Sequence, residues 1–274
     1  MVVFLAGLAT ALATGLGAVP LLLFEEVSDR LNIALWGLAS GIMIAASTLG
    51  LLTEGWQQSE PWAPGLEYGL SVPGATLVPL AVGALVGVGL VVLARTLLEE
   101  EGPVVGQLGG ADSQRLILIL GILTIHSFPE GVAVGVSFAD LTLTEGLPIA
   151  GLTIPPLAIF MTLAISVHNL PEGVAVAIPL WARGARPRAL VFWAVFSSLP
   201  QPIGAVLAYA FVESARGLLP LGYGFAAGAM VLLVVLEFLP EAISLGEGLE
   251  HRGYPALGGG FLAGCLLMLP LVWL

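Results

Sequence analysis

The stretch PLAIFMTLAISVHNLPEGVAVAIPLWA, residues 156–182, decides the class of fold. It is apolar over most of its length, and a helix needs roughly 20 such residues to cross a hydrocarbon core about 30 Å thick. His168 and Glu172 interrupt it, although a charged side chain at that depth costs roughly 2.5 to 3.5 kcal/mol on insertion scales. The stretch therefore predicts a transmembrane helix whose polar residues have a function.

Similar apolar runs fill most of the chain. Of its 274 residues, 58% are hydrophobic and only 10% are charged, which is far from the balance of a soluble domain. Eight runs are long enough to span a bilayer, and they lie at about 2–24, 31–53, 72–94, 116–139, 156–182, 189–212, 217–240 and 255–274. We expect an all-α polytopic membrane protein, with one domain over residues 1–274 and a cytoplasmic loop at about 95–115.

The arginines set the expected orientation, because the chain has no lysine. The loops after the first, third, fifth and seventh runs contain seven of the eight arginines, at positions 30, 95, 115, 183, 186, 188 and 252. Only Arg216 lies on the opposite side. By the positive-inside rule the arginine-rich side is cytoplasmic. This predicts a multi-pass protein of the plasma (inner) membrane with both termini outside the cytoplasm.

Pairs of glycines four residues apart indicate where helices touch. Such pairs occur in several of the runs, and four examples are Gly37 and Gly41, Gly83 and Gly87, Gly224 and Gly228, and Gly260 and Gly264. Small residues at this spacing allow two helix backbones to approach closely in a membrane. The sequence leaves open whether these contacts lie within one chain or between two chains.

The motif His-x-x-Pro-Glu-Gly occurs twice, at 126–131 in the fourth run and at 168–173 in the fifth. Seven of the ten positions that begin at each histidine are identical. Within each copy the His and Glu are four residues apart, so a helix places both side chains on one face. Each helix is therefore expected to present an imidazole above a carboxylate.

The proline and glycine of each motif shape the backbone around these side chains. Pro129 and Pro171 cannot donate to the carbonyl four residues earlier, which predicts a kink in each helix and a free acceptor beside each histidine. Irregular backbone at bilayer depth is expected to line a cavity. Gly131 and Gly173 remove side-chain bulk where the two kinked helices are expected to approach each other.

The converging donors favour a divalent transition metal. Two imidazoles, two carboxylates and nearby amide or hydroxyl oxygens, without a thiolate, suit Zn²⁺, Fe²⁺, Mn²⁺, Co²⁺ or Cd²⁺ better than Cu⁺. Imidazoles disfavour Ca²⁺ and Mg²⁺. We therefore interpret the chain as a metal transporter in which zinc is a substrate and not a prosthetic group. The expected ligands from the motifs are His126, Glu130, His168 and Glu172.

Three other interpretations compete with metal transport. The His and Glu residues could simply hydrogen-bond across a helix interface, although a near-identical second copy of the motif is hard to explain by packing alone. An intramembrane metal hydrolase would also need a metal and a glutamate, but the chain has no His-Glu-x-x-His motif and no serine or cysteine nucleophile beside a base. A proton-coupled solute carrier could use the same residues as a proton relay.

The two motifs resemble those of the Zrt/Irt-like protein (ZIP) family of metal transporters, and most of all its bacterial GufA-like and zinc-uptake-permease branch. The resemblance extends to GLATALATGLG at residues 7–17 and GIMIAAS at residues 41–47. It implies eight helices, uptake into the cytoplasm, and an elevator-like movement of helices one, four, five and six against the other four. Metal ions and the lipid bilayer are the expected partners, with a homodimer implied and no nucleic acid.

The resemblance also implies further site residues, and the chain departs from the family at two of them. Ser127 and Asn169 follow the two histidines, and Met43 is implied as an accessory soft ligand. Relatives commonly have Asn at the position of Ser127, and Glu at the position of Gln201. We hypothesise that a second metal position, present in relatives, is therefore weaker or absent here. Glu237 resembles part of an exit-side motif.

Overall fold

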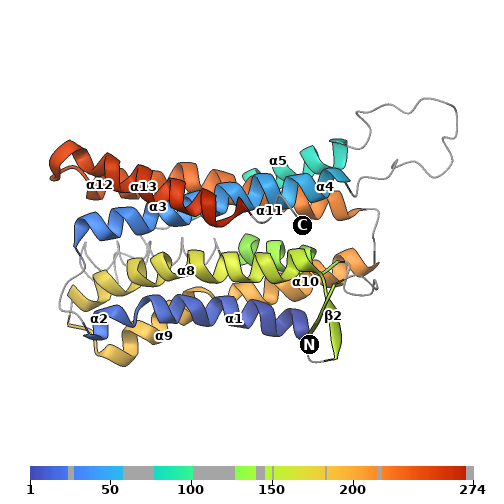
Figure 1. The fold of residues 1–274 in the computed structure, drawn as a ribbon, viewed down its shortest axis with the longest axis horizontal. Coiled ribbons are helices and arrows are strands. Elements are labelled where there is room, and N and C mark those ends of the chain that lie inside the picture. The colour runs from blue at the N-terminus through green and yellow to red at the C-terminus, as the bar shows by residue number, and fades with distance from the viewer. Residues whose placement is uncertain are drawn as a thin grey trace, which may run out of the picture.

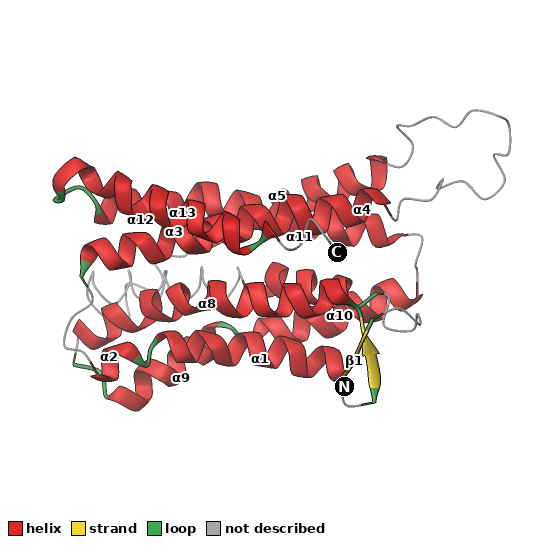
Figure 2. Cartoon of the chain, in the orientation of Figure 1, coloured by secondary structure: helices red, strands yellow, loops and turns green. Residues whose placement is uncertain are grey.

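The computed structural model describes residues 1–23, 28–57, 77–100, 127–139, 146–149, 151–182, 184–214 and 218–269. Helices make up nearly all of them (Figure 2). The exception is a hairpin in which β1 (Leu147–Ile149) pairs antiparallel with β2 (Leu152–Ile154). Gly151 has a φ of 81° at its turn, a value that glycine adopts without strain. The all-α expectation omits this hairpin because each strand has only three residues.

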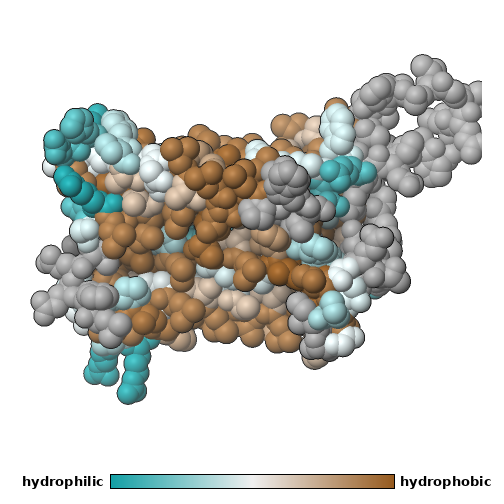
Figure 3. Space-filling view, in the orientation of Figure 1, coloured by the Kyte–Doolittle hydropathy of each residue, from teal (hydrophilic) through white to brown (hydrophobic). Residues whose placement is uncertain are grey.

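Six helices among the described residues are long and apolar enough to cross a membrane. They lie at Val2–Leu22, Asp29–Gln57, Leu77–Thr96, Pro156–Ile178, Pro187–Ser214 and Leu219–Leu245. The space-filling view shows a mostly hydrophobic surface across the middle of the molecule, with hydrophilic residues at its ends (Figure 3). These features confirm a multi-pass helical membrane protein.

The expected count of eight spans stays a prediction. The run at 116–139 is described only from residue 127, where a helical segment covers 127–137. The run at 255–274 is represented by α13 (Tyr254–Leu267), and residues 270–274 lie outside the described part of the chain. In the third run, α5 (Leu77–Glu100) continues into the loop expected from about residue 95.

The helices form two layers (Figure 1). The first layer holds the 127–137 segment, α1 (Val2–Gly17), α2 (Pro20–Leu23), α8 (Pro156–Ala182), α9 (Pro187–Ser197) and α10 (Pro200–Ser214). The second layer holds α3 (Asp29–Ala45), η1 (Ala46–Leu52), α4 (Thr53–Gln57), α5, α11 (Leu219–Leu233), η4 (Val234–Phe238), α12 (Leu239–Leu245), η5 (Glu250–Gly253) and α13.

Two long helices of the second layer each contain a π-helical segment. The segment η1 joins α3 to α4 without a break, and η4 joins α11 to α12 in the same way. A π-turn inserts extra backbone into a helix and changes the direction of the side chains that follow, often at functional sites. In the first layer, a turn at Ser198 and Leu199 separates α9 from α10, directly before Pro200.

Close glycine contacts join the helices within each layer. A Cβ at Gly83 or Gly87 of α5 would overlap the carbonyl oxygen of Leu221 or Phe225 of α11. The other glycine pairs expected from the sequence make similar contacts between α3 and α13 and back from α11 to α5. All four pairs therefore lie at contacts within one chain. Gly222 of α11 meets the opposite layer, at the side chain of Val136.

Several arginines lie at one end of the helices. The ends of α2 and α8, the starts of α3 and α9, and the segment between α12 and α13 lie at the left of Figure 1. Arg186 and Arg188, at the start of α9, are exposed. An ion pair of 3.8 Å joins Arg30, at the start of α3, to Glu250, in η5 between α12 and α13. The helices α2, α8 and α12 therefore end on one side of the molecule, as expected for the loops after the first, fifth and seventh runs.

Candidate metal centre

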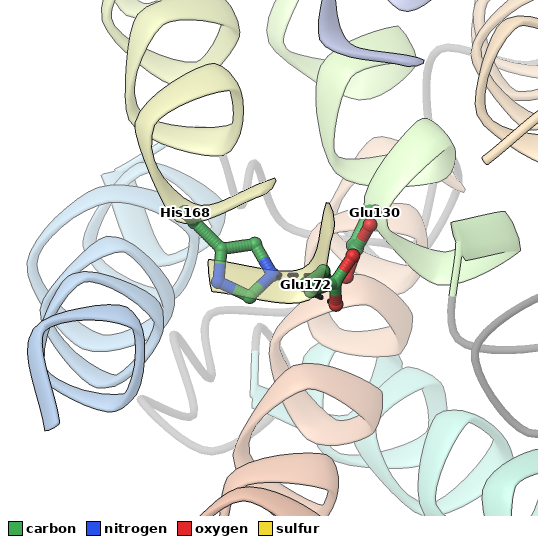
Figure 4. Close-up of side chains that lie close together, drawn as sticks. All are labelled: Glu130, His168 and Glu172. Carbon is green, nitrogen blue, oxygen red and sulfur yellow. Dashed lines mark hydrogen bonds and ion pairs between the residues drawn. The ribbon is translucent and has the colours of Figure 1, made fainter. Parts of the chain in front are cut away.

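Three side chains of the two motifs converge in the first layer (Figure 4). Glu130 comes from the 127–137 segment, whereas His168 and Glu172 come from α8. His168 Nε2 lies 3.1 Å from Glu130 Oε1 and 3.3 Å from Glu172 Oε1. All three residues are buried. The structure thus brings together three of the four expected motif ligands, and the fourth, His126, lies outside the described residues.

The geometry of α8 explains why His168 and Glu172 meet. The helix runs from Pro156 to Ala182 through Pro171, and its pitch brings residues four apart onto one face. The two side chains therefore contact each other along the helix, as expected. The kinks expected at the motif prolines stay predictions.

The motif glycines contact other helices than the sequence analysis expected. A Cβ at Gly131 would overlap the carbonyl oxygen of Gln201 on α10, and one at Gly173 would overlap the carbonyl oxygen of Thr14 on α1. The two motif helices were expected to use these glycines to approach each other. Instead each glycine lets a third helix come close to the backbone of its motif.

A chain of buried amides supports the cluster. Asn169 Nδ2 donates to the carbonyl oxygen of Thr10, at 2.7 Å, and to Gln201 Oε1, at 3.1 Å. Gln201 Nε2 donates in turn to Glu130 Oε2, at 2.5 Å. The four residues come from α1, α8, α10 and the 127–137 segment. Four helices of the first layer are therefore tied together around one carboxylate.

The second layer covers the cluster with aromatic rings. Phe238, the last residue of η4, stacks on the His168 ring with centroids 5.3 Å apart and an angle of 20° between the planes. Trp36 of α3 meets Phe238 edge to face, with centroids 4.9 Å apart. Neither residue was among the site residues expected from the sequence. A single aromatic residue in an apolar helix gives no signal of what it stacks on.

The electrostatics of the cluster call for a cation. The Glu130 side chain is 0% exposed and that of Glu172 is 2% exposed. Buried carboxylates need compensating charge, because transfer from water costs each ion several kcal/mol. The chain has no lysine, and the arginines whose side chains are described are exposed or partly exposed. A protonated His168 would supply one positive charge to the two carboxylates, whereas a divalent cation would supply two.

The distances also suit a metal ion. Zinc binds nitrogen and oxygen ligands at about 2.0 to 2.2 Å, so the ligand atoms of a tetrahedral site lie about 3.3 to 3.6 Å apart. The two distances from His168 Nε2 are close to that range. Asn169 Oδ1 has no hydrogen-bond partner among the described residues. Leaving a buried acceptor unpaired costs about 1 to 3 kcal/mol, and coordination of a cation would remove that cost.

Comparison with known proteins gives the family. The sequence model of a family described as ZIP zinc transporter matches residues 99–271, which include both motifs. The chain belongs to the ZIP family. Members of this family are transporters, which confirms that the chain is a transporter and not an enzyme. It also confirms the resemblance inferred from the motifs.

Several curated relatives of this ZIP protein are zinc transporters by name. Zinc transporter GufA of Myxococcus xanthus is 32% identical over 268 residues, which are 96% of each chain. Zinc transporter ZIPB of Bordetella bronchiseptica is 34% identical over 97% of this chain and 78% of its own. A putative zinc transporter of Arabidopsis thaliana is 38% identical over 86% of this chain, but the match spans only 33% of the plant protein.

The remaining site residues expected in this ZIP protein lie outside the three-residue cluster. Ser127 is buried at the start of the 127–137 segment, one turn before Glu130. Met43 of α3 is fully buried in the hydrophobic core. Glu237 in η4 is partly exposed, and its Oε1 lies 3.5 Å from Arg95 Nη1. The expected roles of these residues as ligands stay predictions.

Proposed function

We propose that this ZIP protein carries divalent transition-metal ions, with zinc foremost, across the membrane and into the cytoplasm. The observation that carries the proposal is the buried cluster of Glu130, His168 and Glu172. Two carboxylates and an imidazole form a site for Fe²⁺, Mn²⁺, Co²⁺ or Cd²⁺ as well as for zinc. The names of GufA and ZIPB support zinc as the first candidate.

We infer that transport proceeds by alternating access, with the first layer moving as a unit against the second. Glycine-mediated backbone contacts join helices within each layer, whereas the contacts across the interface include a ring stack and a glycine against a valine side chain. Sliding of packed helices past one another is one way in which parts of a protein move during a conformational change. The cluster lies in the first layer beside the interface, so such a movement would carry the bound ion with it. A homodimer, which the family resemblance implies, stays a prediction.

We infer that the arginine-rich end faces the cytoplasm and that both termini lie outside it. The exposed arginines at this end of the helices, Arg30, Arg186, Arg188 and Arg252, support this orientation. A reporter fused after Leu274 is expected to be active only in the extracytoplasmic compartment. A reporter at this position that reads as cytoplasmic would reverse the assignment. A reporter within the 95–115 loop is the control, and it is expected to read as cytoplasmic.

Zinc is expected to stabilise the detergent-purified protein against heat. A ligand that binds only the folded state adds about 2.7 kcal/mol of stability at a free concentration 100 times its Kd, so Tm is expected to rise by several degrees. The double variant with Glu130→Ala and His168→Ala removes two ligands and is expected to lose the response. Differential scanning fluorimetry with and without Zn²⁺ or Cd²⁺ measures it.

The matched control for this experiment carries the same two substitutions at exposed positions. Glu213→Ala and His251→Ala lie in α10 and η5, and both side chains are exposed. This control is expected to keep the full zinc response. If the wild-type Tm ignored every divalent transition metal, the cluster would be a proton relay or a packing feature, and the proposed function would be wrong.

A further inference from the structure

We propose that Gln201 is a positioning residue that turns Glu130 toward His168 and limits the cluster to one divalent ion. The proposal rests on the proposed function, because it concerns how the same cluster holds its substrate. Gln201 is fully buried in the first turn of α10, and its side chain reaches both Asn169 and Glu130. It contacts the carboxylate oxygen that does not face the histidine.

The direction of the hydrogen bonds follows from one obligate acceptor. The carbonyl oxygen of Thr10 can only accept, so the group of Asn169 beside it must be the NH₂ group. That NH₂ group also faces Gln201, so the Gln201 atom it meets must be the amide oxygen. The other end of the Gln201 amide is then its NH₂ group, which must donate to Glu130. Neither amide can flip without placing like groups against each other.

In this arrangement the two carboxylate oxygens of Glu130 have different partners. Oε2 accepts from Gln201, while Oε1 lies 3.1 Å from His168 Nε2 and faces the cluster. A cation beside Oε2 would have to approach the hydrogens of the Gln201 amide, which repel it. Glu130 can therefore offer one oxygen to one ion. Both NH₂ hydrogens of Asn169 are also in use, because they donate to Thr10 and to Gln201.

The charge of the cluster also favours a single divalent ion. Glu130 and Glu172 carry two negative charges when both are ionised, and one divalent ion balances them. A second divalent ion would leave two positive charges uncompensated in a buried site, which is unfavourable because water cannot solvate them there. Gln201 adds no charge, whereas a glutamate in its place would add a third carboxylate beside Glu130.

The test counts zinc ions per chain in purified full-length protein, by equilibrium dialysis followed by elemental analysis. The wild type is expected to bind one zinc ion. Gln201→Glu removes the donor and adds a carboxylate, so it is expected to bind two. Gln201→Met keeps the length but removes both hydrogen bonds, and it is expected to bind one ion with about 10- to 100-fold lower affinity, as for other residues that orient a metal ligand.

The control Gln57→Glu makes the same chemical change at an exposed position on α4, and it is expected to match the wild type. Two tight zinc ions in the wild type would overturn the proposal, and so would one ion in Gln201→Glu. Unchanged affinity in Gln201→Met would overturn the positioning role and leave the proposed function intact. No zinc bound by the wild type would overturn both. If Gln201→Glu fails to fold, the wild-type count and the Gln201→Met affinity still decide.

Discussion

Replacing His168 with alanine is expected to weaken zinc binding by at least about 100-fold and to reduce zinc transport to background. The imidazole lies within 3.3 Å of both carboxylates, and it is the one nitrogen donor in the cluster that the described residues form. Loss of a residue that merely orients a ligand costs about 10- to 100-fold in metal affinity, so loss of a direct ligand should cost more. Isothermal titration of the purified variant with zinc measures the binding.

Glu172→Ala is expected to have an effect of similar size, because it removes half of the negative charge that a divalent ion would balance. The exposed His251 and Glu213 give the matched controls His251→Ala and Glu213→Ala, which are expected to bind zinc like the wild type. Equal affinity in His168→Ala and His251→Ala would show that the ion binds elsewhere. Size-exclusion profiles of all four variants separate loss of a ligand from loss of folding.

Gly173→Ala is expected to destabilise the protein by about 1 to 3 kcal/mol, although it adds only one methyl group. A Cβ at Gly173 would overlap the carbonyl oxygen of Thr14, and Gly17 fits against the carbonyl oxygen of Leu170 in the same contact. The helices α1 and α8 would therefore have to separate. The hydrogen bond from Asn169 to Thr10 crosses this contact and would weaken with it.

Gly89→Ala is the matched control for Gly173→Ala. Gly89 also lies within a helix, α5, but a Cβ there would meet no atom within 4 Å. Alanine is favoured over glycine in a helix by about 1 kcal/mol, so this variant is expected to be as stable as the wild type or more stable. Thermal unfolding in detergent measures both changes. If the two variants shifted Tm equally, the contact between α1 and α8 would not be as close as described.

Much of the fold could be predicted from the sequence because bilayer thickness sets the length of a spanning helix. The run at 156–182 coincides with α8 for this reason. The partners of the helices were harder to predict, because a glycine pair marks a close contact without naming the helix on the other side. The structure supplies the partners, α5 with α11 and α3 with α13. The π-helical segments η1 and η4 left no sequence signal that we recognised.

The candidate site was predicted where it depends on local geometry. The pairing of His168 with Glu172 follows from the pitch of one helix, and it is present. The stack of Phe238 on His168 and the hydrogen bond from Gln201 to Glu130 depend on how separate helices meet, so neither could be read from spacing. Gln201 was expected as a site residue that lacks the carboxylate relatives commonly have there. The structure shows an amide that makes two specific hydrogen bonds.

The most direct test of the central claim, that the cluster of Glu130, His168 and Glu172 holds the transported ion, is the initial rate of radioactive zinc uptake into proteoliposomes. Wild-type, His168→Ala and His251→Ala proteins are reconstituted at equal amounts and compared with protein-free liposomes. We expect uptake by the wild type and His251→Ala, and a background rate for His168→Ala. Uptake by His168→Ala at the wild-type rate would contradict the claim.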